Sequence, residues 1–346
     1  MRSQSLSSVV AVFAVIAGLS APAAAQTALQ LQQQAAAEAA GGAPFPLHAW
    51  ISLTQNVGSG TFVASPFNPN VSSQLTLTPF LTWEGYTVLV NQSFGLEWTA
   101  SELTTYANQI EMSDTSIAVR YTRLNFPELN LMLMPQVTFQ VPISLLSRQA
   151  GSLGTPSAGA RLIWNLPDVG ASFYATGSTG FSILVPALSQ RFAGEAGKPV
   201  IDDLGNSVTT QSCIVRSSTE LLSYACGILP MGFRWSAGAG GSWSGFDNQL
   251  SVNLDVGYLQ GFSIFNAPDD ELKADAAVAG YGMRQFTSGN LSATYIPAGW
   301  VYLTAGLSTF QPTFQEDGTT PRFPLWDFVS PYNNLSSIYF DVTFAL

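Results

Sequence analysis

Charged residues are scarce in this chain. Asp, Glu, Lys and Arg make up 10% of its 346 residues, whereas hydrophobic residues make up 47%. Soluble domains average about 25% charged residues, so this composition favours a membrane β-barrel over the alternative, a large secreted β-sandwich. The few charges are mostly acidic, with 22 acidic against 12 basic residues and a net charge of −10. We therefore expect no nucleic-acid partner, which would require a basic surface.

Long apolar runs are also lacking. The clearest one, "VVAVFAVIAGL" over residues 9–19, lies near the N-terminus and is shorter than the roughly 20 residues that span a bilayer as a helix. Arg2 precedes the run, and Ala23 and Ala25 supply the small-residue motif of a signal-peptidase site. We expect residues 1–25 to be a cleaved signal peptide. Residues 26–46 then form an N-terminal segment, rich in Ala and Gln, that suits a short helix.

Histidine and cysteine are nearly absent. His48 is the one histidine, and a Ser–His nucleophile needs a histidine within hydrogen-bond reach. The sequence shows no His/Cys cluster for zinc, no Gly-rich phosphate loop and no nucleophile elbow, so we expect no enzyme, metal or cofactor. The two cysteines, Cys213 and Cys226, predict one disulfide in an exported protein.

Alternation with period two is what the sequence has in abundance. Apolar residues occupy every second position in segments such as 86–99, 250–258 and 338–346, which is typical of strands with one apolar and one polar face. About twelve such segments follow one another from residue 47. Most run about ten residues, the length that a tilted strand needs to cross a bilayer.

The connections between these segments alternate strictly between short and long. Short ones lie at residues 84–85, 126–130, 167–170, 239–247 and 297–299, and much longer ones lie between them. Membrane barrels have this asymmetry, with tight periplasmic turns and long extracellular loops. The sequence therefore predicts an all-β fold: a closed antiparallel transmembrane β-barrel of about 12 strands over residues 47–346.

Aromatic residues lie at the expected strand ends, with the parity of the apolar face. Trp83, Trp164, Trp235 and Phe344 are placed near the short connections, and Trp98 and Tyr258 near the long ones. Such rings fit the two membrane–water interfaces. With this banding, the chain resembles bacterial outer-membrane barrel proteins over roughly residues 47–346.

The resemblance implies an integral outer-membrane location and contact with outer-membrane lipid and lipopolysaccharide. It also implies that the barrel assembly machinery reads the C-terminal strand. The residues that match its alternating pattern are Phe340, Val342, Phe344 and Leu346. The family usually ends in Phe, and this chain ends in Leu.

Strand parity also sorts out the residues that face the lumen. Arg120, Arg161 and Arg234 are expected at similar depth, each about five residues from a short turn, with Arg284 higher. The expected lumen carboxylates are Glu97, Asp255 and Asp341. A row of fixed cations can favour the passage of anions. Alternatively, the arginines pair with carboxylates or backbone and brace the wall.

A second expected lumen group is aromatic and consists of Trp50, Trp300, Tyr302 and Tyr339. These rings either guide ring-bearing solutes or pack against the N-terminal segment, which would then plug the lumen. Two functions follow from these alternatives. The first is a channel for small solutes with a weak anion preference. The second is a structural or surface-interaction barrel with a plugged lumen, whose outer loops bind a partner or lipid.

Overall fold

The computed structural model describes most of the barrel region. The described residues are 47–62, 69–99, 108–144, 147–148, 152–184, 199–201, 207–209, 213–216, 221–224, 231–263, 283–314, 320–323, 326 and 335–346. The expected signal peptide (1–25) and N-terminal segment (26–46) lie outside them, as does Cys226. These two segments and the Cys213–Cys226 disulfide therefore stay predictions.

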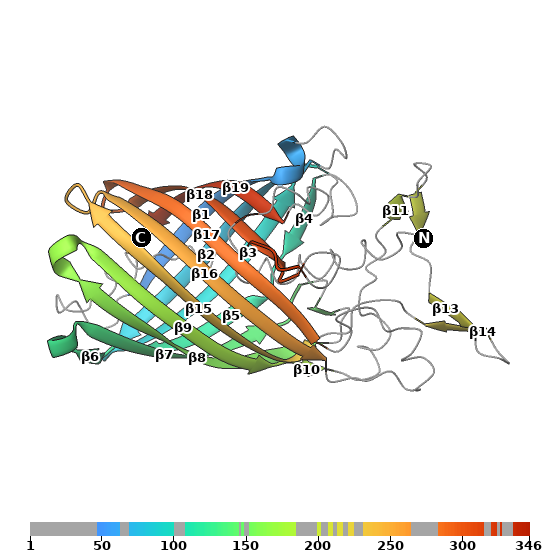
Figure 1. Cartoon of the computed structure of the whole chain (residues 1–346), viewed down its shortest axis with the longest axis horizontal. Coiled ribbons are helices and arrows are strands. Elements are labelled where there is room, and N and C mark those ends of the chain that lie inside the picture. The colour runs from blue at the N-terminus through green and yellow to red at the C-terminus, as the bar shows by residue number, and fades with distance from the viewer. Residues whose placement is uncertain are drawn as a thin grey trace.

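Twelve antiparallel strands close into one barrel, with three extra strands attached to the same sheet. Figure 1 shows the closed barrel. The prediction of a closed barrel is confirmed. The barrel strands are β1 (Leu47–Gly58), β2 (Val71–Trp83), β3 (Tyr86–Glu97), β5 (Thr115–Tyr121), β7 (Leu131–Val141), β8 (Ser152–Leu166), β9 (Ala171–Phe181), β15 (Met231–Gly245), β16 (Leu250–Ser263), β17 (Met283–Ala298), β18 (Val301–Pro312) and β19 (Ser336–Ala345). Closure comes from β1, which pairs with β19 at Trp50↔Ala345 through Gly58↔Ser337.

The remaining elements are short. β4 (Gln109–Met112), β6 (Leu124–Phe126) and β10 (Ile183–Leu184) extend the main sheet. Two separate hairpins are formed by β11 (Pro199–Ile201) with β12 (Ser207–Thr209) and by β13 (Cys213–Arg216) with β14 (Leu221–Tyr224). The 3-10 turns are η1 (Ser59–Phe62), η2 (Pro127–Leu129) and η3 (Pro167–Val169).

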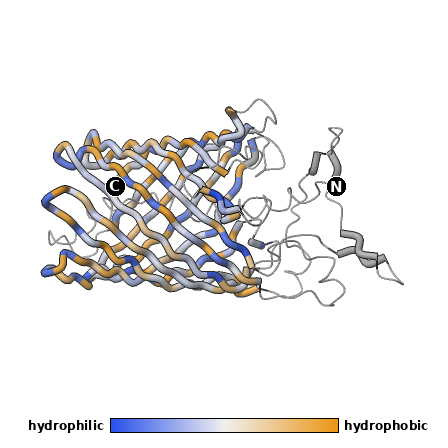
Figure 2. The backbone as a smooth tube through the Cα atoms, in the orientation of Figure 1, coloured by the Kyte–Doolittle hydropathy of each residue, from blue (hydrophilic) through white to orange (hydrophobic). Residues whose placement is uncertain are grey.

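The apolar face of the strands points outward. In β19, Ile338 and Phe340 are each 47% exposed, whereas the intervening Tyr339 is 6% exposed. The same alternation of hydrophobic and hydrophilic residues runs along the other strands (Figure 2). A soluble barrel would bury the apolar face, so this orientation is that of a barrel built for lipid.

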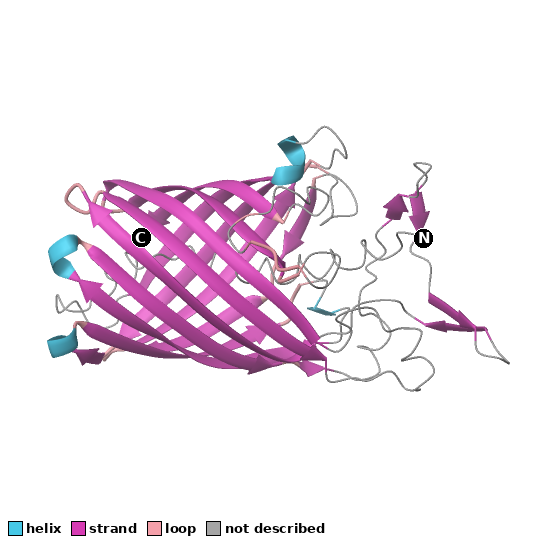
Figure 3. Cartoon of the chain, in the orientation of Figure 1, coloured by secondary structure: helices cyan, strands magenta, loops and turns pink. Residues whose placement is uncertain are grey.

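The strand ends joined by short connections lie at one end of the barrel, which we call the short-turn end. The strand ends joined by long connections lie at the other, the long-loop end. Figure 3 shows η2 and η3 with the tight turns at the short-turn end. One predicted boundary was wrong. β15 continues through Gly245, and its turn is 246–249 rather than 239–247. Trp235 therefore lies toward the long-loop end beside Tyr258, with ring centroids 5.3 Å apart, and the outward-facing Trp243 lies at the short-turn end.

The turn between β2 and β3 depends on one glycine. Gly85 has φ +87°, and a Cβ there would lie 2.5 Å from Arg123 Cγ. Gly299, in the turn between β17 and β18, has no atom within 4 Å of such a Cβ. We expect Gly85→Val to destabilise the folded barrel by about 1–2 kcal/mol, because a branched side chain is strained in the left-handed region. Gly299→Val should cost much less. Urea unfolding of both variants in lipid measures the difference, and equal destabilisation would contradict this account of the turn.

Candidate functional site

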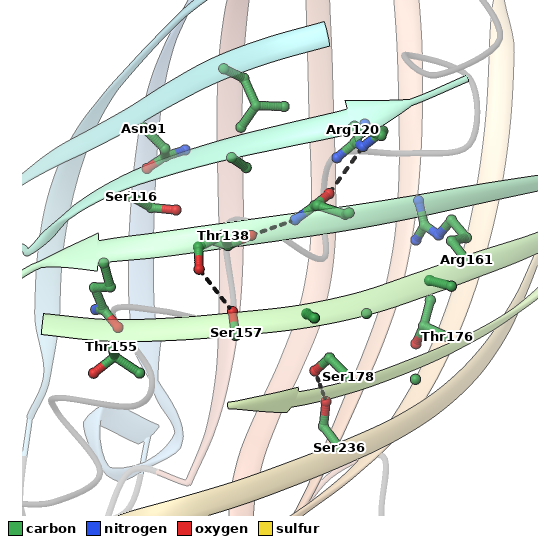
Figure 4. A pocket seen from close by; sticks show the side chains of 18 of the residues that line it. Asn91, Ser116, Arg120, Thr138, Thr155, Ser157, Arg161, Thr176, Ser178 and Ser236 are labelled. Atoms are coloured by element: carbon green, nitrogen blue, oxygen red, sulfur yellow. Dashed lines mark hydrogen bonds between the residues drawn. The ribbon is translucent and has the colours of Figure 1, made fainter. Parts of the chain in front are cut away.

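A polar cavity of about 360 Å³ follows one inner wall of the barrel. Its wall comes from β3, β5, β7, β8, β9 and β15, and hydroxyl and amide side chains dominate the lining (Figure 4). They include Asn91, Ser116, Gln136, Thr138, Gln140, Thr155, Ser157, Thr176, Ser178 and Ser236. Ser178 and Ser236 share a hydrogen bond of 2.7 Å at an exposed position in the lumen.

Three of the predicted arginines line this cavity together: Arg120, Arg161 and Arg234. The strand register explains how they meet. On β7, the consecutive inward positions are Met134, Gln136 and Thr138. Arg161 pairs with the first and Arg120 with the second. Arg234 lies in the same row as Thr138, because Arg234 pairs with Gly180, Gly180 with Ser157, and Ser157 with Thr138.

The expected depth of Arg234 was nevertheless wrong. It lies near the start of β15, far from the short turn that follows this strand. Counting residues along one strand ignores the stagger between tilted neighbouring strands. That stagger is what brings Arg234 beside the other two guanidinium groups.

Arg120 is held by an amide. Its Nε donates to Gln136 Oε1 at 3.0 Å, and Gln136 Nε2 donates in turn to Thr138 Oγ1 at 2.9 Å. Figure 4 shows this chain of side chains along the inner wall. This hydrogen bond fixes the guanidinium in the wall of the cavity that it lines.

Arg161 lies over an aromatic ring. Its Cζ is 4.2 Å from the centroid of Tyr174, a cation–π geometry that fixes a guanidinium without consuming its N–H donors. Below it, Met132, Met134 and Ile163 are buried against Tyr174. Tyr174 was not singled out from the sequence, although its parity on the strand places it in the lumen.

Arg234 belongs to a longer network at the long-loop end. Its Nη2 donates to Gln140 Oε1 at 3.4 Å, and Gln140 Nε2 donates to Asp114 Oδ2 at 3.3 Å. Asp114 also accepts from the Ser144 amide at 2.8 Å and from the Ser147 hydroxyl. The network ties the connection after β7 to the cavity wall. It was invisible in the sequence because it joins three separate segments.

Arg284 lies in the same row of residues as Arg234, two strands away. It pairs with Gly261 of β16, which also pairs with Arg234. It does not line the cavity, and its place at the start of β17 is near the long loops, as expected.

The predicted lumen carboxylates are on other strands than the arginines. Asp341 accepts from Thr54 Oγ1 at 2.7 Å and from Thr343 Oγ1 at 2.6 Å, so it braces β19 against β1. Asp255 accepts from Asn290 Nδ2 at 3.3 Å. Glu97 is buried and accepts from Thr99 Oγ1 at 3.3 Å.

Three of the four predicted lumen aromatics face inward. Trp50 packs on Phe80 with centroids 4.7 Å apart, Tyr302 is buried, and Tyr339 donates to Asn290 Oδ1 at 2.9 Å. Trp300 was predicted wrongly. It is 58% exposed and stacks on outward-facing Phe344, with centroids 6.2 Å apart. Trp300 belongs to the turn before Val301, where the alternation of the strand no longer applies.

Apolar side chains form two clusters in the lumen toward the short-turn end. Phe80, Leu89 and Ala118 form one buried cluster with Trp50, and Ile296 and Tyr302 form another with Ala345. We call these clusters and the methionine cluster under Arg161 the apolar base of the lumen. Leu89, Ala118 and Met134 of this base also line the polar cavity.

Within the residues that the structure describes, no group of three or more His, Cys, Asp or Glu side chains is arranged to hold a metal ion. No helix in the same part of the chain has the length and hydrophobicity to cross a membrane.

Comparison with known proteins gave matches at the level of structure. No protein-family model and no curated protein matches the sequence. Among solved structures, the chain is similar to the COG4313 outer membrane channel from Pseudomonas putida F1, with 9% identity, 88% of this chain and 97% of that chain covered, and a TM-score of 0.49. It is also similar to the NanC porin (8% identity, 86% and 98% covered, TM-score 0.42) and to the outer membrane channel DcaP of Acinetobacter baumannii (10%, 88% and 98%, 0.35).

Proposed function

We propose that this barrel is an outer-membrane channel for small polar solutes, with a preference for anions. The observation that carries the proposal is the polar cavity inside the lumen, onto which Arg120, Arg161 and Arg234 converge. Guanidinium groups present several N–H donors in a fixed plane that matches a carboxylate or phosphate. The surrounding hydroxyl and amide groups can replace water around a solute as it passes.

Location in the outer membrane is supported by the outer surface. Apolar side chains cover it, and aromatic rings lie near both ends, with Trp83 and Trp164 at the short-turn end and Trp98 at the other. Amphipathic rings fit the two membrane–water interfaces. In this orientation the short turns are periplasmic, and the long loops meet lipopolysaccharide.

A carboxylate in the cavity does not cancel the expected preference for anions. Asp114 lines the cavity, but it accepts hydrogen bonds from Gln140, Ser144 and Ser147. A carboxylate with its acceptor sites occupied attracts a cation less than an exposed one does. Three guanidinium groups against one such carboxylate leave a net positive wall.

Single-channel recording of the refolded barrel in a planar bilayer tests the function. We expect stable unitary steps. Across a potassium chloride gradient, the reversal potential should be shifted toward the equilibrium potential of chloride. A barrel that is folded, as judged by heat-modifiable migration on a gel, but shows no steps would contradict the channel.

The apolar base of the lumen favours the second function that the sequence left open, a plugged barrel whose outer loops bind a partner or lipid. The clusters around Phe80, Met134 and Tyr302 offer an apolar surface on which the N-terminal segment (26–46) could lie. In that case, removal of residues 26–46 should raise the unitary conductance several-fold. Equal conductance with and without the segment would rule the plug out.

A further inference from the structure

Two opposite charges approach each other inside the lumen without forming an ion pair. Arg161 on β8 and Asp255 on β16 carry opposite charges and lie on either side of Tyr174 and Gly240. Within the described residues, the guanidinium contacts the ring of Tyr174 at 4.2 Å and Asp255 accepts from Asn290. Both charges therefore keep hydrogen-bonding capacity that the wall does not use.

Tyr174 contacts Arg161 and lies beside the same glycine as Asp255. Its ring lies under the Arg161 guanidinium. A Cβ at Gly240, the residue of β15 that pairs with both Tyr174 and Asp255, would lie 2.5 Å from Tyr174 Oη and 2.5 Å from Asp255 Oδ1. The phenol and the carboxylate thus converge over the one inward position of β15 where the absence of a side chain leaves room for them.

Unpaired polar atoms accumulate on the Asp255 side of this point. Asp255 Oδ1 is buried and has no hydrogen-bond partner among the described residues, and the same is true of both amide atoms of Asn253 and of Ser251 Oγ. Asn253 is 3% exposed and Ser251 0%. These three residues are successive inward positions of β16, and buried polar groups in native proteins are almost always hydrogen-bonded. Their grouping points to a ligand with donors for a carboxylate and an amide.

We propose that Arg161 and Asp255 together bind solutes that carry both a carboxylate and an ammonium group, an inference that rests on the channel function proposed above. The solute carboxylate lies on the guanidinium of Arg161 in the cavity. Its ammonium group lies on Asp255 Oδ1, with Asn253 beside it. An anion without the ammonium group also binds Arg161, but it leaves Asp255 Oδ1 without a hydrogen-bond partner.

Tyr174 determines the order in which the carboxylate and the ammonium group of the solute bind. A carboxylate that binds the N–H edge of Arg161 draws the guanidinium away from the face of the Tyr174 ring. The side chain of Tyr174 then moves away from Gly240 and uncovers Asp255 for the ammonium group. Tyr339 keeps Asp255 oriented meanwhile, because its hydroxyl donates to Asn290 and Asn290 donates to the carboxylate.

Liposome swelling tests the proposal, with serine as the zwitterionic probe and erythritol as a neutral solute of similar size. We expect the wild-type barrel to admit serine roughly three- to tenfold faster than erythritol, because only serine carries the two charges that Arg161 and Asp255 bind. Asp255→Asn should bring this ratio close to one. Gly240→Ala should do the same without any change of charge, because its Cβ displaces both oxygens.

Asp341→Asn is the matched control. It removes the same charge from the lumen wall, at a carboxylate whose two oxygens already accept from Thr54 and Thr343, and it should preserve the ratio. Equal swelling of the wild type in serine and erythritol would overturn the zwitterion site and leave the channel in place. An equal loss of the ratio in Asp255→Asn and Asp341→Asn would show an effect of overall charge and overturn it too. No swelling with either solute would instead overturn the channel function on which the site rests.

Discussion

Cells that express the Phe340→Arg variant should contain little folded barrel in their outer membrane. Phe340 is 47% exposed on the outer face of β19, where it pairs with Gln55 and Ala305 near the middle of the strand. A lipid-facing arginine at the bilayer midplane costs about 2–4 kcal/mol, a large part of the roughly 5–15 kcal/mol that stabilises a typical fold.

The position of β19 enlarges this effect. β19 pairs with β1 and thereby closes the barrel, and it carries the proposed assembly signal of Phe340, Val342, Phe344 and Leu346. A change near the end of the strand should be milder. Phe344→Asp lies close to the interface, where a charge costs about 0–1 kcal/mol, so its folded level should fall less.

The matched control for Phe340→Arg places the same arginine on the opposite face. Ser236 is half-buried on the lumen wall, and Ser236→Arg should reach the outer membrane at near wild-type levels. The heat-modifiable band in the outer-membrane fraction measures the folded barrel. Wild-type levels of Phe340→Arg, or equal losses in the two variants, would refute the assignment of the outer face.

The fold was predictable because its main signal is local. Period-two alternation in segments such as 338–346 indicates which face of a strand contacts lipid. The alternating lengths of the connections indicate the order of the strands. The boundary of β15 was not predictable in the same way. Its stretch "AGAGGSWSG" resembles a loop in composition. In the barrel, however, its glycines are strand residues whose missing side chains admit neighbours: a Cβ at Gly238 would lie 2.9 Å from Thr176 Oγ1, and one at Gly240 would meet Tyr174.

The site was predictable only in part. Parity placed Arg120, Arg161 and Arg234 in the lumen. Their meeting in one cavity depends on the stagger between strands, which no single segment encodes. The partners Gln136 and Tyr174 depend on the same register, and so they escaped notice.

Replacing Arg120, Arg161 and Arg234 together by alanine should reverse the ion preference of the channel. The lumen then keeps its carboxylates, Asp255 and Asp341 among them, and loses the cations of the cavity. At an effective dielectric constant near 20, one charge at 4 Å contributes about 4 kcal/mol, so even a partly screened change of three charges should alter the chloride-to-potassium permeability ratio by tenfold or more. The reversal potential in a potassium chloride gradient measures this ratio directly.

Salt dependence separates the fixed charges from changes in pore shape. The Debye length is about 10 Å at 0.1 M salt and about 3 Å at 1 M, so the wild-type anion preference should weaken as salt rises, whereas a steric change would persist. Arg123→Ala is the control, because Arg123 packs over Gly85 in the turn region and does not line the cavity. A triple variant with an unchanged reversal potential would mean that ions follow a path away from this wall, and that the arginines only brace the strands.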